Sequence, residues 1–100
     1  MKLILITVVE EFEQEVKKIL KHSGVKSFSL HPVKGYKNNS EDNLHNWFGI
    51  DDIAINSLLF IVFAQQQSIE EIIEKVTLFN QHQDSQSQIH LVSIQTDKSI

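Results

Sequence analysis

The sequence predicts a single small α+β domain in which strands and helices follow the order βαββαβ. Three observations predict this fold class. Two segments have apolar residues at helical spacing, four others have the composition of strands, and the six segments alternate in that order. A chain of 100 residues can bury one hydrophobic core but not two, so we expect one domain over residues 1–100.

The first strand and the first helix are predicted within the first 24 residues. Residues 2–9 are mainly aliphatic and are followed by acidic residues, which is typical of a buried strand. Gly24 is expected to end the helix that follows, because glycine readily adopts the left-handed conformation found after a helix C-terminus. The apolar residues with the spacing of a helix's buried face are Phe12, Val16, Ile19 and Leu20.

A half-exposed second strand and a long loop are predicted next. Residues 26–36 alternate between apolar and polar side chains around Phe28 and Leu30, and Pro32 places this strand near a sheet edge. Residues 37–55 contain a polar stretch without a helical or strand period. They predict a long protruding loop, and a long loop in a compact domain is often functional.

The second half of the chain predicts a strand, a helix and a last short strand. Residues 57–64 contain an uninterrupted apolar run, which indicates a strand covered on both faces. Ser68 and Glu71 have the spacing of a capping box and predict the start of the second helix. The predicted buried stripe of that helix consists of Ile69, Ile72, Ile73, Val76 and Phe79. A polar connection over residues 81–88 leads to the last strand, residues 89–94.

This order is that of the ferredoxin-like fold, with a four-stranded antiparallel sheet and two helices on one face. The first and third strands, which are apolar on both faces, should occupy the centre of the sheet. Two helices cover only one face, so Leu3, Leu5 and part of residues 58–63 would leave an apolar patch exposed on the other. We therefore expect the chain to form an oligomer.

Composition argues against several functions. The net charge is −4 and the nine basic residues are all lysine, so a nucleic-acid partner is not expected. Cysteine is absent, which excludes disulfides and thiolate metal sites. No apolar run approaches the ~20 residues of a membrane helix, so we expect a soluble, cytoplasmic protein without membrane insertion. The sequence also lacks a P-loop, a nucleophile elbow and a His-Glu-x-x-His motif, and we do not expect an enzyme.

At Val33-Lys34-Gly35-Tyr36, just before the predicted loop, the chain resembles the PII signal-transduction proteins, which carry a Val-Lys-Gly-aromatic step at this point. It is most similar to small, divergent PII-like proteins and, more distantly, to CutA-type trimers. The resemblance implies a homotrimer with its sheets packed inward, ligands in clefts between subunits, and partner binding through residues 37–55. The partner implied is a protein such as a membrane transporter, and the function implied is regulation in response to a small ligand.

The candidate ligand-binding residues are Lys34, Gly35, Tyr36 and His90. Lys34 is the best candidate to meet an anion, because backbone can approach a ligand closely at the neighbouring Gly35; alternatively, it is a solvated lysine. PII proteins hold ATP or ADP with a glycine-containing basic loop and arginines. Residues 83–88 contain neither glycine nor lysine, and the chain has no arginine, so the ordinary ATP-binding residues are absent. The ligand could be a nucleotide, a similar molecule or a divalent metal.

The candidate partner-binding residues in the loop are His45, Asn46, Trp47 and Phe48. The large aromatic side chains of a Trp-Phe pair in a polar stretch could anchor a partner protein. Alternatively, the pair folds back and packs the loop against the protein itself. A third possibility for the whole chain is an interaction module that binds no small ligand.

A second function follows from the histidines. His45 and His31, together with carboxylates at a subunit interface, could form a metal site. The resemblance to divergent PII-like proteins implies that the chain would then be a metal-binding protein of divalent-cation homeostasis associated with cation efflux. The histidines lack the close spacing of a strong metal motif. A histidine on a strand is otherwise a partly buried, hydrogen-bonded side chain.

Overall fold

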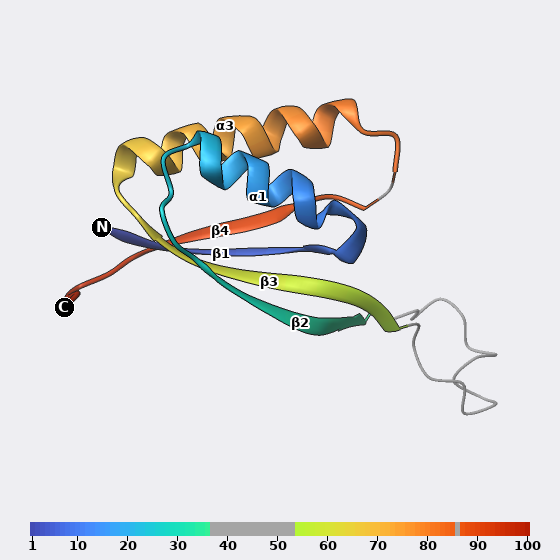
Figure 1. The fold of residues 1–100 in the computed structure, drawn as a ribbon, viewed down its shortest axis with the longest axis horizontal. Helices are drawn as coiled ribbons and strands as arrows, with labels where there is room; N and C mark the ends of the chain where they lie inside the picture. Colours follow the sequence, from blue (N-terminus) through green and yellow to red (C-terminus); the bar gives the residue numbers. More distant parts are fainter. Residues whose placement is uncertain (37–53, 86) are drawn as a thin grey trace.

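A computed structural model describes residues 1–36, 54–85 and 87–100. Two helices lie side by side on one face of a four-stranded sheet, and both chain termini lie at the end of the sheet opposite the β2–β3 connection (Figure 1). The elements are β1 (Lys2–Val9), a 3-10 turn (Glu10–Phe12), α1 (Glu13–His22), β2 (Ser29–Tyr36), β3 (Ala54–Ala64), α3 (Gln66–His82) and β4 (His90–Gln95). The predicted α+β fold with βαββαβ order is confirmed.

The strand order in the sheet is β2-β3-β1-β4, and every neighbouring pair is antiparallel. The strands at the centre are therefore β1 and β3, as their apolar composition predicts. Pro32 lies on the edge strand β2, where the missing N–H group of proline is tolerated.

The hydrophobic core lies between the sheet and the two helices. Alternate residues of β1 and β3 point toward the helices, because successive side chains of a strand lie on opposite faces. The core residues of these strands are Ile4, Ile6, Val8, Leu58, Phe60 and Val62, and the helices contribute Val16, Ile19, Leu20, Ile69, Ile72 and Val76. At one end, the rings of Phe12 and Phe79 pack edge to face with centroids 5.1 Å apart.

Two details of the second helix differ from the prediction. Helix α3 begins at Gln66, after a single connecting residue, so Ser68 and Glu71 lie inside it and form no capping box. The amide of Ile69 already donates to the carbonyl of Gln65, 3.1 Å away, which starts the helix three residues early. Ile73 is 42% exposed rather than part of the buried stripe, because Ile69, Ile72 and Val76 occupy the face that meets the sheet.

The ends of two strands also differ from the prediction. Strand β2 begins at Ser29 rather than at residue 26, and β3 begins at Ala54, so residues 54 and 55 belong to a strand and not to the predicted loop. Gly24 has the predicted left-handed conformation, with φ +83°, and it follows the C-cap residue Ser23 of α1. In the described part of the chain, no helix is long and apolar enough to cross a membrane.

Candidate functional site

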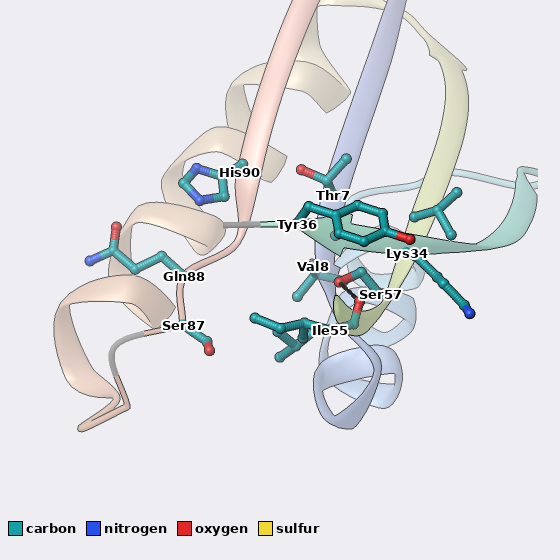
Figure 2. Close-up of a pocket in the computed structure, with 12 residues that line it drawn as sticks. Thr7, Val8, Lys34, Tyr36, Ile55, Ser57, Ser87, Gln88 and His90 are labelled. Carbon is teal, nitrogen blue, oxygen red and sulfur yellow. Dashed lines mark hydrogen bonds between the residues drawn. The ribbon is translucent and has the colours of Figure 1, made fainter. Parts of the chain in front are cut away.

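A cavity of about 400 Å³ lies at the end of the sheet where β2 and β3 lead to residues 37–53 (Figure 2). All four strands, or the residues next to them, contribute to its wall. The lining residues are Thr7, Val8 and Val9 of β1; Val33, Lys34, Gly35 and Tyr36 of β2; Ile55 and Ser57 of β3; and Ser87, Gln88 and His90. The cavity is thus built from the two central strands and from both edges of the sheet.

The four candidate ligand-binding residues all line this cavity. Lys34, Gly35 and Tyr36 close β2 at one edge of the sheet, and His90 begins β4 at the other edge. The structure therefore brings together residues that are 54 positions or more apart in the sequence. That they bind a ligand remains a prediction.

Side-chain alternation places most of the lining on the face of the sheet that the helices leave uncovered. Thr7 pairs with His90, and Gly35 pairs with Ile55, so these residues share that face. A Cβ atom added at Gly35 would lie 3.1 Å from the hydroxyl oxygen of Ser57, which is closer than an ordinary contact. The absence of a side chain at Gly35 therefore keeps this part of the cavity open.

Lys34 and Tyr36 lie on either side of Gly35 in β2, so their side chains leave the strand on the opposite face from the one that Gly35 shares with Ile55. The ammonium group of Lys34 points away from His90 and Ser87 (Figure 2). Lys34 thus lies at one rim of the cavity, and the opposite side contains the hydroxyl group of Ser87, the amide group of Gln88 and the imidazole group of His90.

Sequence reasoning missed several polar residues of the cavity: Thr7, Ser57, Ser87 and Gln88. Thr7 had a detectable signal, because it is the one polar residue within an otherwise aliphatic run from Leu3 to Val9. Ser57 lies within β3, and Ser87 and Gln88 lie in the polar connection before β4, where serine and glutamine carry no specific signal. Ser57 donates a hydrogen bond from its hydroxyl to the carbonyl of Ile55, 3.2 Å away.

Asn80 of α3 holds the chain that enters β4. Its side-chain amide donates to the carbonyl of Ile89, and its amide oxygen accepts from the N–H of Ile89, both at 2.9 Å. The side-chain amide of Gln83 also donates to the carbonyl of Ser87. Since Ser87, Gln88 and His90 surround Ile89, these bonds fix one wall of the cavity to α3.

Replacing Asn80 with alanine is expected to remove both hydrogen bonds between its side chain and Ile89. The backbone N–H and C=O groups of Ile89 would then lose these partners. We expect a loss of about 1–3 kcal/mol in the free energy of unfolding, measured by urea denaturation. Hydrogen exchange at the Ile89 amide should accelerate. Gln81→Ala, at an exposed position of the same helix, is the control; equal losses in both variants would contradict the role of Asn80.

The face of the sheet opposite the helices is largely apolar. We call it the open face, and it consists of Leu3, Leu5, Leu59, Ile61, Phe63, Val92 and Ile94. The register places Leu3 between Phe63 and Ile94, and Leu5 between Ile61 and Val92, so these side chains form adjacent rows. Phe63 is 55% exposed, Val92 53% and Ile94 44%. The apolar patch expected from the sequence is present.

The remaining candidates are the four loop residues and His31. His45, Asn46, Trp47 and Phe48 lie outside the described residues. His31 pairs with Leu59, which pairs with Thr7, which pairs with His90, so His31 and His90 lie at opposite edges of the sheet. Among residues 1–36, 54–85 and 87–100, no group of three or more histidine or carboxylate side chains could hold a metal ion.

These observations define a ferredoxin-like α+β domain with a ligand-sized cavity next to its long β2–β3 connection. Solved structures with this fold include CPII from Thiomonas intermedia K12, a nitrogen regulatory PII-like protein bound to ADP, AMP and bicarbonate. It is 13% identical, with a TM-score of 0.64, over 99% of this chain and 94% of CPII. The GlnK–ATP complex of B. subtilis is 14% identical, with a TM-score of 0.65, over 93% of this chain and 80% of GlnK.

The apo form of CPII is also similar, at 14% identity and a TM-score of 0.59, over 93% of this chain and 89% of CPII. No family model matches the sequence, and no curated protein matches it. At such low identities the similarity establishes the fold. The resemblance to PII-like proteins inferred from the sequence is confirmed at that level.

Proposed function

We propose that this chain is a PII-like regulatory protein rather than an enzyme. In this proposal a homotrimer binds a small ligand, a nucleotide or a similar molecule, in the cavity and regulates a protein partner through residues 37–53, which connect β2 and β3. The observation that carries the proposal is the position of the cavity. Its wall includes Tyr36 and Ile55, and Tyr36 directly precedes the connecting segment. A bound ligand would therefore contact the chain where that segment begins, and binding there can change its order.

The size and composition of the cavity agree with a small ligand. Its volume of about 400 Å³ lies within the usual range for ligand pockets, and aliphatic walls combined with a few polar groups are typical of them. CPII has been solved with ADP and AMP, and GlnK with ATP. CPII is described as a nitrogen regulatory protein. These precedents support a nucleotide-like ligand and a regulatory role. As the resemblance to PII-like proteins implies, the proposed protein is cytoplasmic and its partner is a protein such as a membrane transporter.

The open face supports an oligomer, and the resemblance to PII-like proteins implies that this oligomer is a trimer. A patch that includes three large side chains at 44–55% exposure is unusual for the surface of a soluble monomer. A partner copy would remove this patch from water. In a closed ring, the two edges of the sheet would face neighbouring subunits, and the cavity, which involves both edges, would lie near the subunit boundary.

A thermal-unfolding panel at fixed protein concentration tests the ligand. ATP, ADP, AMP, cyclic nucleotides, Zn²⁺, Cu²⁺ and Ni²⁺ are added separately. A ligand at ~100 times its Kd should add about 2.7 kcal/mol of apparent stability. Stabilisation by a nucleotide supports the proposal. If only a metal ion stabilises the protein, the result favours a metal site that includes His45 and His31. If none of the compounds stabilises it, the result favours an interaction module that binds no small ligand.

The variant Gly35→Val connects the stabilisation to the cavity. Valine suits a strand, but its side chain would enter the space next to Ser57, so we expect the shift caused by a nucleotide to fall by more than half. Ser93→Val, at an exposed position of β4 outside the cavity lining, is the matched control and should keep the full shift. A full shift in Gly35→Val would place the ligand elsewhere.

A further inference from the structure

The cavity has an unusual charge balance for a nucleotide-sized site. Among the described residues that line it, Lys34 is the only one with a formal charge, and no carboxylate is present. The rest of the polar lining consists of hydroxyl groups, one amide, and the imidazole of His90. Lys34 lies at one rim and points away from His90 and Ser87 (Figure 2), and the described residues on the opposite side include no lysine or arginine.

The backbone on that side is also partly occupied. Backbone N–H groups can hold phosphate when they are free to point at it. Here the N–H of Ser87 donates to the hydroxyl oxygen of Ser85, and the N–H of Ile89 donates to the side chain of Asn80, both at 2.9 Å. The two amides are therefore already bonded within the protein. A di- or triphosphate placed against this wall would lose hydration without receiving these donors in return.

We propose that the cavity takes a nucleotide-sized ligand with at most one negative charge and selects against di- and triphosphates. This inference rests on the proposed function of the cavity as the ligand site. A single negative charge can be offset by Lys34 at the rim. The uncharged, planar part of the ligand can pack against the aliphatic side chains of Val9, Val33 and Ile55.

Calorimetric titration with one series of compounds tests the charge limit. The series is adenosine, adenosine 5′-methyl phosphate, AMP, ADP and ATP, which keeps the nucleoside constant while the negative charge increases. We expect the methyl phosphate, with one charge, to bind best, and ATP to bind at least about tenfold more weakly. Lys34→Gln should weaken the methyl phosphate and leave adenosine unchanged.

A variant that adds a charge should reverse the selection. Gln88 lies on the wall without formal charge, so Gln88→Lys supplies a cation where the phosphates of ATP lack one. We expect its affinity for ATP to increase about tenfold, with adenosine unchanged. Gln95→Lys adds the same charge at an exposed position near the other end of β4 and should leave ATP binding as in the unmodified protein.

The possible results separate the two levels of the proposal. Tighter binding of ATP than of the methyl phosphate would overturn the charge limit and leave the cavity as a nucleotide site. Equal gains in Gln88→Lys and Gln95→Lys would also overturn it, because a general charge effect would then explain ATP binding. Absence of binding throughout the series would overturn the ligand site itself, and with it this inference.

Discussion

Val92→Glu is expected to convert the proposed oligomer into folded monomers. Val92 is 53% exposed and lies on the open face opposite Leu5, so a glutamate there remains hydrated when the chain is alone. In the proposed assembly the same carboxylate would be buried against a neighbouring apolar surface. An unpaired buried charge costs about 3–5 kcal/mol, and a symmetric trimer would contain it three times. Sedimentation equilibrium measures the change in mass directly.

Ser93→Glu is the matched control for this prediction. It places the same charge one residue further along β4, on the other face of the sheet, at a position that is already exposed and polar. We expect this variant to keep the mass of the unmodified protein. If both variants dissociate, net charge rather than the open face explains the effect. If Val92→Glu remains oligomeric and folded, the open face is not the subunit interface.

The arrangement of the sheet could be predicted because local composition reports directly on burial. The uninterrupted apolar run from Leu58 to Phe63 needs cover on both faces, and this requirement places β3 at the centre of the sheet. The start of α3 could not be predicted in the same way. The Ser68–Glu71 spacing is a local signal, but β3 ends at Ala64 and the helix begins after one residue, so the tertiary connection determines the boundary instead.

The candidate site was predictable only where residues carry a local signature. Lys34, Gly35 and Tyr36 belong to a short motif beside a long connection, and the structure places all three in the cavity wall. Thr7 and Ser57 enter the wall through the pairing of β1 and β3. That register fixes which side of each strand faces the cavity, and no segment alone contains this information.

Phe60→Ala is expected to destabilise the fold itself. The Phe60 side chain is fully buried on the helix side of β3 and packs against the ring of Phe28, with centroids 5.6 Å apart. Truncating a buried phenylalanine costs about 3–5 kcal/mol, because apolar contact is lost and a cavity remains. A small domain has only about 5–15 kcal/mol of total stability, so we expect a large fall in the urea midpoint.

Phe63→Ala makes the same chemical change on the same strand and should act differently. Phe63 is 55% exposed on the open face, so its loss removes little from the core of a single chain. It should instead weaken the assembly, and its effect on thermal unfolding should therefore depend on protein concentration. Phe60→Ala should lower the unfolding temperature at every concentration tested. If the two variants lose similar stability at all concentrations, Phe63 stabilises the isolated fold and the division between the core and the open face is wrong.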